Sequence, residues 1–541
     1  MQQGVPGRSS AGLAGVLLTL AASPAQAASF EVGPGKTYEN ISDAPLGSLN
    51  AGDEVVVYYR TEPYRESFGI ERAGTAQSPI TIRGVEGPGG ELPIIDGESS
   101  SPGPGAHNRG LVHTGPGAAY VVFENFEIRN ANADAGFPDN ASGVFAPDGS
   151  HLTFRNLDIH DSGNGVFSWV NASDIIVEGC FIHDNGNVDS IYEHNIYTES
   201  DGIVFQYNVI LAPRVGARGN GLKDRSRGTV VRFNWIEGGN RVLDLVEAED
   251  GDWDHTNDPV HVYGNVLFKH EETSQSQIVH FGQDNGMPPR RLMYFYHNTT
   301  VSDRSDGATI FFINSDTRVE AYNNVFVSTG GALELLDPDQ SAGATLVLGA
   351  NWIQSGYRGG SNSARFEGLE NLIEGADPGL DQDYRPDAGS QLIDAGGPLP
   401  QGYDLVATEF AGRGHVRQRG DSAAPDLGAF GAESKDDPGS GGSGGGGSGS
   451  NGGSAGTGDG GTGSGSSGNG ASSGNGASSG TSGSSGNGAS GGAQGGANKA
   501  GGGGDDDGGC GCRAAPRPRY PLGIGLLAFL GLALKRRRGR P

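Results

Sequence analysis

The sequence predicts an all-β chain folded as a right-handed parallel β-helix, a solenoid of short strands with an N-terminal cap. Short segments alternate apolar and polar residues with a period of two, while no apolar stripe of 3.6-residue spacing reaches helix length. The segments recur about every 23 to 33 residues, a spacing typical of stacked repeats. Each segment also contains an Asn or Gly, which suits a bend between two strands.

The alternating segments supply the first set of expected strands, at residues 122–128, 152–159, 176–182, 204–210, 231–236, 262–267, 294–300, 320–326 and 347–352. Their expected bend residues are Asn125, Asn156, Gly179, Asn208, Asn234, Asn265, Asn298, Asn324 and Asn351. Because Asn and Gly tolerate positive φ best, we expect left-handed backbone at these positions. We also expect the stacked Asn side chains to hydrogen bond from coil to coil.

A second set of short strands lies between the bends, at residues 165–169, 195–199, 221–225, 242–246, 278–282, 309–313 and 332–336. Two or three strands per coil predict that each strand pairs with its equivalent in the next coil. An uncovered end of the stack would be an unpaired edge, so we expect a cap at the N-terminal end. Residues 33–97 resemble the N-terminal part of bacterial surface β-helix proteins, which implies that the cap and first coils include residues 54–59 and 79–84.

The ends of the chain predict export. Arg8, an apolar run at 11–22 and Ala25-Gln26-Ala27 form a secretory signal at residues 1–27 with cleavage before Ala28. Residues 28–433 are expected to be the β-helix domain. Residues 434–509 are Gly/Ser-rich with almost no apolar side chains, so we expect a disordered tether.

Residues 510–541 contain Cys510-Gly511-Cys512, an apolar run at 520–534 and an Arg-rich end at 535–538. The run is shorter than a typical membrane span of about 20 residues. The order of cysteines, short apolar run and Arg cluster resembles the myxobacterial C-terminal sorting tag, which implies a transmembrane anchor, a cell-surface location and processing or release near the cysteines. A cytosolic amphipathic tail is the alternative. Cys180 stands alone in the folded region and is expected to be buried.

The formal charge of −27 argues against a nucleic-acid partner, because phosphate contacts need an extended basic face. Charge is nevertheless segregated locally. A run of bases (Arg214, Arg218, Lys223, Arg225, Arg227, Arg232 and Arg241) is followed by a run of acids (Asp244, Glu247, Glu249, Asp250, Asp252 and Asp254). A basic patch on rigid strands predicts a polyanionic polysaccharide as partner. The protein itself is expected to be a monomer.

Aligning the second set of strands places Ile196, Leu222, Leu243 and Val279 inside, so Tyr197, Lys223, Asp244 and His280 should project outward in successive coils. Adjacent coils lie about 4.8 Å apart, which brings neighbouring members of this stripe within reach of one sugar residue. The stripe is therefore the expected active site.

For β-elimination on a uronate chain, Lys223 is the predicted base, and Tyr197 or His280 the acid. Arg225 or Arg241 is expected to hold the substrate carboxylate as a bidentate pair. Further predicted substrate contacts are Arg218, Trp253 and His194, and the oxygen ligands of Asp244, Glu247 and Glu249 suit Ca²⁺.

Each of these predictions has a plainer alternative. Lys223 can form a surface ion pair with Asp224, and the acidic run at 247–258 can be a solvated loop, because it lacks an EF-hand pattern. Trp253 can pack on its own loop. His160 and His183 end equivalent coils and are expected to stack as a structural ladder.

Residues 29–432 resemble the right-handed parallel β-helix family of secreted carbohydrate-active proteins, which includes the pectate lyases. The most specific motifs are 389–396 (GSQLIDAG) and 424–430 (APDLGAF), which are similar to the ending of bacterial surface β-helix proteins. Residues 226–234 are similar to the segment after the catalytic Lys of the chondroitinase B and alginate lyase group, where a Lys base and an Arg act beside calcium.

The match to that group has departures. Arg225 stands where the Lys base is expected, and Lys223 lies two residues earlier. The preceding calcium-binding glutamates are absent, and Val246 falls near the expected Arg.

Three functions remain open from the sequence. The first is a surface-anchored lyase acting on acidic glycans. The second is a glycoside hydrolase that uses Asp244 with Asp224 or Glu247 as a carboxylate pair. The third is a non-catalytic glycan-binding or adhesive rod.

Overall fold

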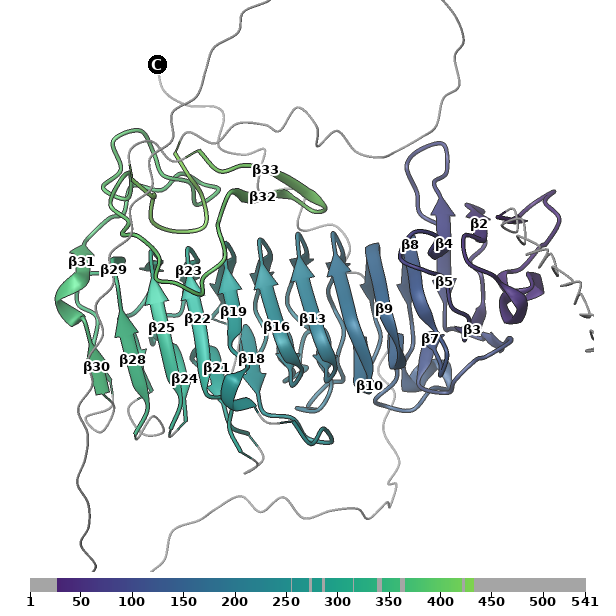
Figure 1. Ribbon diagram of the computed structural model, residues 1–541, viewed down its shortest axis with the longest axis horizontal. Coiled ribbons are helices and arrows are strands. Elements are labelled where there is room, and N and C mark those ends of the chain that lie inside the picture. The colour runs from purple at the N-terminus through teal and green to yellow at the C-terminus, as the bar shows by residue number, and fades with distance from the viewer. Residues whose placement is uncertain are drawn as a thin grey trace, which may run out of the picture. The chain divides into compact units, whose positions relative to one another are not determined.

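The computed structural model describes residues 27–432 apart from 254, 272–274, 285–287, 315, 338–342, 361–364 and 421–423. Within these residues the chain winds as a parallel β-helix, and 31 of its strands join into one sheet that wraps around the coils (Figure 1). The central coils each contribute a strand to each of three walls, here named walls A, B and C. All-β architecture is confirmed for the described residues, whose helices are all short 3-10 turns.

Wall A contains β3 (Glu66–Ile70), β7 (Gly110–Thr114), β12 (Ile196–Thr198), β15 (Leu222–Asp224), β18 (Leu243–Val246), β21 (Gln277–Gly282), β24 (Ala308–Ile313) and β27 (Leu333–Leu336). The short β6 (Ser101–Pro102) pairs with β3. Wall A also includes the first residues of two long strands that turn the corner, β9 (Ser142–His160) and β10 (Asn164–Glu178).

Wall B contains β1 (Ser29–Val32), β2 (Glu54–Tyr58), β4 (Ile80–Val85), β13 (Asp201–Gln206), β16 (Arg227–Arg232), β19 (Val260–Tyr263), β22 (Leu292–Tyr296), β25 (Arg318–Tyr322), β28 (Thr345–Leu348) and β30 (Arg365–Glu367). The long β8 (Ala119–Arg129) starts on wall B and ends on wall C. The later parts of β9 and β10 complete wall B.

Wall C contains β5 (Ile94–Asp96), β11 (Phe181–Ile182), β14 (Val209–Ile210), β17 (Trp235–Glu237), β20 (Val266–Lys269), β23 (Thr299–Ser302), β26 (Val325–Ser328), β29 (Asn351–Gln354) and β31 (Leu372–Gly375). The 3-10 turns are η1 (Ile41–Asp43), η2 (Leu46–Ser48), η3 (Ala133–Ala135), η4 (His255–Asn257) and η5 (Leu369–Asn371). Every strand pair between coils is parallel, as the repeat pattern predicts.

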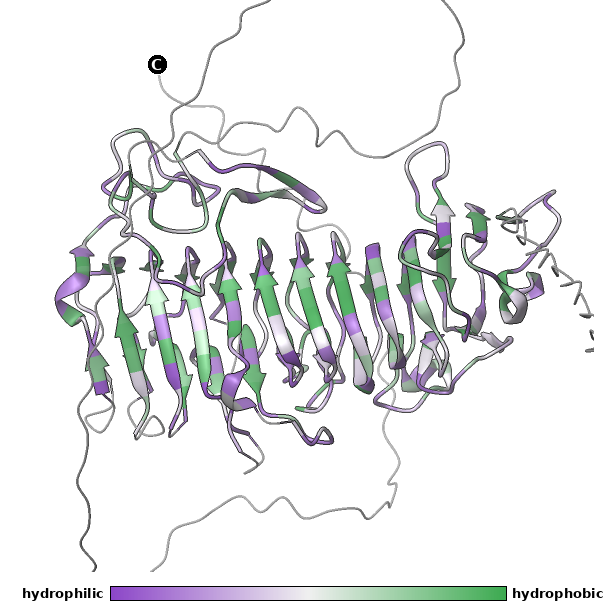
Figure 2. Cartoon of the chain, viewed as in Figure 1, coloured by the Kyte–Doolittle hydropathy of each residue, from purple (hydrophilic) through white to green (hydrophobic). Residues whose placement is uncertain are grey.

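Alternation along the strands fills the inside of the coils. In β13, Ile203 and Phe205 are buried while Val204 between them is partly exposed, and the same pattern recurs in the neighbouring strands. Figure 2 shows that the strands of the coils are largely apolar and that polar residues are more frequent in the turns between them. Both predicted strand sets are confirmed, so period-two patterning alone locates the coil strands.

A ladder of buried Asn side chains runs along the corner between walls B and C. Its members are Asn208, Asn234, Asn265, Asn298, Asn324 and Asn351, all fully buried. Each Nδ2 of the first five donates to Oδ1 of the next Asn, at 2.8–3.2 Å. The predicted coil-to-coil hydrogen bonds are therefore confirmed.

The predicted left-handed bend is misplaced by one residue in the later coils. Positive φ occurs at Asn125, Asn156 and Gly179, but then at Tyr207 and Phe233, directly before the ladder Asn. The register explains the difference, because two residues separate the walls in each coil and the ladder Asn is the second of them. In the earlier coils the second position holds Phe126, Leu157 and the buried Cys180.

The coil stack is covered at its N-terminal end and along the outside of wall B. At the N-terminal end, Ile41, Leu46 and Leu49 are buried against the first coil. Near the C-terminal end of the described residues, 399–420 and 424–432 run over the outside of wall B, where Phe410 and Phe430 share one apolar cluster with Tyr263 and Tyr296. This segment carries the antiparallel hairpin β32 (Thr408–Gly412) and β33 (His415–Gln418).

The predicted signal, tether and C-terminal anchor lie outside the described residues. Among those that the structure describes, no helix is long and apolar enough to cross a bilayer. The export signal and the membrane anchor stay predictions of the sequence.

Candidate functional site

A single outward-facing line of side chains crosses wall A from coil to coil. The strand registers pair Tyr197 with Lys223, Lys223 with Asp244, and Asp244 with His280. The line continues to Phe312 on one side and to Phe167, Phe145 and His113 on the other. The four predicted residues therefore share one wall, and we call the whole line the wall A stripe.

Lys223 lies at the centre of the stripe. Its Nζ donates to Asp244 Oδ2 at 3.0 Å and to Asp284 Oδ2 at 2.6 Å. Only 10% of its side chain is exposed. An amino group that donates to two carboxylates has the bonding arrangement of an ammonium ion.

Arg225 follows Lys223 along the chain and contacts the same aspartate. Its Nη2 donates to Asp284 Oδ2 at 2.9 Å, Nη1 donates to the Glu247 backbone oxygen at 2.9 Å, and Nε donates to the Tyr197 hydroxyl at 3.2 Å. Burial lowers the pKa of Arg225, but its neighbours Tyr197 and Asp284 outweigh this effect and raise it. One carboxylate oxygen of Asp284 therefore accepts hydrogen bonds from both Lys223 and Arg225.

Asp244 is fully buried below Lys223 and surrounded by donors. Asn220 Nδ2 donates to Oδ2 at 2.7 Å, and His280 Nδ1 contacts Oδ1 at 2.5 Å, with Arg241 Nη1 3.3 Å away. Burial raises the pKa of Asp244, but the nearby cations, led by Lys223, hold it well below its usual range. Asp244 is a fixed anion that positions Lys223.

His280 is 1% exposed and bonded on both ring nitrogens. Besides Asp244, it faces two oxygens through Nε2, the Gln283 carbonyl at 3.1 Å and Asn314 Oδ1 at 3.2 Å. Oxygen atoms therefore face the His280 ring on both of its nitrogen sides. Its ring also stacks on Phe312 at 4.4 Å. This geometry places His280 as support for Asp244, beneath the exposed part of the site.

Tyr197 forms the other edge of the charged cluster. Its hydroxyl donates to Glu249 Oε2 at 2.7 Å, and burial raises its pKa, so the phenol keeps its proton. Glu249 belongs to a loop held over β12 by Glu199, whose Oε1 accepts from three consecutive backbone amides at 2.6–3.1 Å.

His194 lies beside Tyr197, with the two rings edge to face at 5.3 Å. Its Nδ1 accepts from the Asn220 backbone amide at 2.8 Å, so the proton of the neutral ring resides on Nε2. Burial, reinforced by Lys223, lowers the pKa of His194 to about 3. The ring is therefore a neutral donor at physiological pH.

Two predicted substrate contacts lie at the periphery. The Trp253 ring packs closely over Gly251 of its own loop and edge-on to His255 at 6.4 Å, which is the plainer alternative for this residue. Arg218 is exposed and its guanidinium has no partner among the described residues.

The predicted calcium ligands do not form a calcium site among the described residues. Asp244 is surrounded by donors, Glu247 Oε2 accepts from the Asp284 amide at 2.6 Å, and Glu249 accepts from Tyr197. Over the described part of the chain, no three His, Cys, Asp or Glu side chains cluster as metal ligands. Calcium binding stays a prediction of the sequence.

The predicted hydrolase pair and the predicted Lys223–Asp224 ion pair are both unsupported by the geometry. Asp224 is fully buried and accepts from Arg290, Thr198 and Thr229. Glu247 is 1% exposed. Neither carboxylate is open to a sugar or an attacking water.

Sequence reasoning missed Asp284 and Asn220. Asp284 comes from the loop after β21 and meets β15 only through folding, so no local pattern marks it. One signal was its position four residues after His280, at the end of a strand in the stripe. The predicted His160–His183 stack is present, with the rings 5.0 Å apart.

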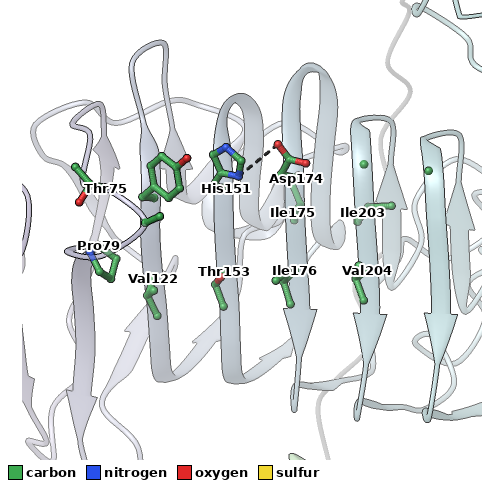
Figure 3. A pocket seen from close by; sticks show the side chains of 14 residues that line it. Thr75, Pro79, Val122, His151, Thr153, Asp174, Ile175, Ile176, Ile203 and Val204 are labelled. Carbon is green, nitrogen blue, oxygen red and sulfur yellow. Dashed lines mark ion pairs between the residues drawn. The ribbon is translucent and has the colours of Figure 1, made fainter. Parts of the chain in front are cut away.

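A separate groove of about 520 Å³ lies on wall B, away from the stripe. Val122, Thr153, Ile176 and Val204 form its floor and succeed one another in register (Figure 3). Tyr120 and His151 stack at 4.2 Å on its rim. Its lining contains no Lys or Arg, so an anionic glycan has no cation to meet there.

Comparisons with known proteins agree with the coil architecture. A family model described as a right-handed β-helix region matches residues 109–267, in agreement with the coil architecture of that region. A search of curated proteins found no match.

The solved structures that are similar to this chain include two lyases and a glycosidase. An alginate lyase from Paenibacillus sp. str. FPU-7 is 17% identical over 53% of this chain and 92% of its own, with a TM-score of 0.41. Pectate lyase Pel9A is 14% identical over 74% of this chain and 96% of its own, with a TM-score of 0.40. A GH136 lacto-N-biosidase from Eubacterium ramulus is 12% identical over 64% and 68%, with a TM-score of 0.40.

Proposed function

We propose that this chain is an exported, cell-surface β-helix protein that acts on acidic polysaccharides at the wall A stripe, as a lyase that cleaves by β-elimination. The observation that carries the proposal is the position of Asp284. Its carboxylate oxygen accepts from Lys223 at 2.6 Å and from Arg225 at 2.9 Å. Two rigidly held cations that bind one carboxylate are suited to bind the carboxylate of a uronate.

The residues match the three requirements of β-elimination. Arg225 neutralises the substrate carboxylate, Lys223 takes the C5 proton, and the Tyr197 phenol protonates the leaving O4 as the C4–O4 bond breaks and the C4–C5 double bond forms. Asp244, held by Asn220 and His280, positions Lys223. Lys223 works as a base only after Nζ has lost a proton, so cleavage should accelerate as the pH rises.

A non-catalytic glycan-binding rod is the second candidate, and one observation favours it. Lys223 donates to two carboxylates, and an amino group held in this way suits ligand binding better than proton abstraction. Under this proposal the same residues hold an acidic glycan without cleaving it.

One experiment separates the two candidates. The purified protein is incubated with alginate, chondroitin or pectate while the absorbance of new unsaturated chain ends is recorded. The lyase proposal predicts product from at least one glycan and none from Lys223→Ala with its fold intact. Binding without product at any pH supports the rod, and neither binding nor product refutes both.

A further inference from the structure

Arg109 is an unpaired cation at the edge of wall A. It lies directly before β7, and none of the described carboxylates or carbonyls accepts a hydrogen bond from its guanidinium. Its Nε is buried without a partner. In a chain with a formal charge of −27, such a cation is left without the counter-ion that most arginines of this protein have.

The Arg109 side chain extends along the coil axis over the next two coils. Its guanidinium carbon lies 5.1 Å from the Phe145 ring centre, 4.6 Å from that of Phe167 and 5.4 Å from that of Trp169. Burial lowers the pKa of Arg109. Contact with three aromatic faces compensates only part of the lost hydration, so an anion that reaches the guanidinium gains a strong partner.

The aromatic platform joins the charged cluster without a break. Phe167 is the register partner of Tyr197, and their rings meet edge to face at 5.2 Å. Tyr197 is in turn the register partner of Lys223. Two coil spacings of about 4.8 Å each therefore separate Phe167 from Lys223, a span of roughly 10 Å along the stripe.

Trp169 gives the platform a fixed, partly open face. Its Nε1 donates to Asp250 Oδ2 at 2.7 Å, which anchors the indole to the loop that also carries Glu249. A ring held in this way offers a flat apolar surface of the kind on which sugar rings stack.

We propose that Arg109, Phe167 and Trp169 form a second acidic-sugar subsite on the same stripe. The proposal rests on the proposed function, because it takes the ligand to be an acidic polysaccharide. It adds that one chain occupies both subsites, with one acidic group at the Lys223–Arg225 pair and another at Arg109. The ligand class is therefore an oligosaccharide with at least two acidic residues, rather than a single uronate.

The test compares short and long ligands. Binding of oligogalacturonate and oligomannuronate, each as disaccharide and hexasaccharide, is measured by calorimetry for the wild type, Arg109→Gln and the control Arg155→Gln. Arg155 is a surface arginine on wall B that pairs with Glu124 and Glu178. We expect Arg109→Gln to weaken hexasaccharide binding about tenfold or more, as for loss of one charge-assisted hydrogen bond. Disaccharide binding and the control should be unchanged.

Equal hexasaccharide affinity in the wild type and Arg109→Gln overturns the proposal and leaves Arg109 a packing residue. Equal weakening for both ligand lengths also overturns it, because the effect then lies at the Lys223 site. If Arg109→Gln does not fold, Arg109→Lys takes its place, and it should lose part of the hexasaccharide preference because lysine lacks the planar fork.

The binding measurement separates this proposal from the lyase proposal. If the wild type cleaves no glycan but Arg109→Gln weakens hexasaccharide binding, the subsite proposal is supported and the lyase proposal is refuted. If Lys223→Ala abolishes cleavage and Arg109→Gln leaves the hexasaccharide affinity unchanged, the lyase proposal is supported and the subsite proposal is refuted. A protein that binds neither ligand loses both.

Discussion

Replacing Asp284 by Asn should make the charged site bind acidic glycans more tightly. Asp284 Oδ2 accepts from both Lys223 and Arg225, and its side chain is 28% exposed. Each cation keeps another partner without it, Asp244 for Lys223 and Glu247 for Arg225. The Asp284 carboxylate therefore competes with the ligand carboxylate for Lys223 and Arg225. Both cations keep another partner when the Asp284 charge is removed.

The magnitude follows from these contacts. A hydrogen bond to a charged group contributes about 1.5–3 kcal/mol, and a ligand carboxylate must replace the bonds that Asp284 makes. Removing the competing charge should lower the dissociation constant roughly tenfold to a hundredfold at low salt, since 1.4 kcal/mol is a factor of ten. The gain should shrink at high ionic strength because the site is partly exposed.

Calorimetry with a hexauronate at low salt measures this change. Asp201→Asn is the matched control, because Asp201 pairs with Arg227 on the surface of wall B. Unchanged or weaker hexauronate binding by folded Asp284→Asn, relative to the wild type, would refute the idea that Asp284 occupies the ligand position.

Three further predictions concern activity, pH and stability. Lys223→Ala should abolish the formation of unsaturated ends while the far-ultraviolet spectrum stays that of the wild type; cleavage at the wild-type rate would exclude Lys223 as the base. Asp244→Asn should lower the free energy of unfolding by about 3 kcal/mol at neutral pH, because it removes the charge of a buried ion pair. Folding lowers the pKa of Asp244. The difference in unfolding free energy between the wild type and Asp244→Asn should therefore persist above the unfolded pKa of about 3.9 and vanish as the pH falls through the lower folded pKa. A difference that grows as the pH falls would contradict this reasoning. Asn234→Ala should cost about 3 kcal/mol in urea unfolding, because it leaves Asn208 Nδ2 and the Phe205 carbonyl without their buried partner; a loss below 1 kcal/mol would mean that the ladder relaxes.

The strands and the wall A stripe could be predicted because they follow from local alternation. Once Leu222 faces inward, Lys223 must face outward, and repetition aligns it with Tyr197 and Asp244. The bend was misplaced because Asn tolerates positive φ and also forms buried amide ladders. At Asn208 and its equivalents, the hydrogen bonds of the Asn ladder fix the place of the Asn side chain, and the preceding residue adopts the left-handed backbone.

The partners of the stripe could not be predicted in the same way. Asp284 and Arg109 reach it from segments far from Lys223 in the sequence. Asp284 lies 61 residues after Lys223, and Arg109 lies still further away on its N-terminal side. Alternation says which face a side chain takes, but not which loop side chain lies across it. The acidic run at 247–258 looked like a source of metal ligands, whereas Glu247 and Glu249 meet donors from their own chain.

The central claim is that Lys223 and Arg225 together bind the carboxylate of an acidic glycan. A crystal structure of the protein with a bound hexauronate tests it most directly. The claim predicts a uronate carboxylate within hydrogen-bonding distance of both cations, with Asp284 displaced from them. A hexauronate bound elsewhere, with Asp284 still bridging Lys223 and Arg225, would contradict it.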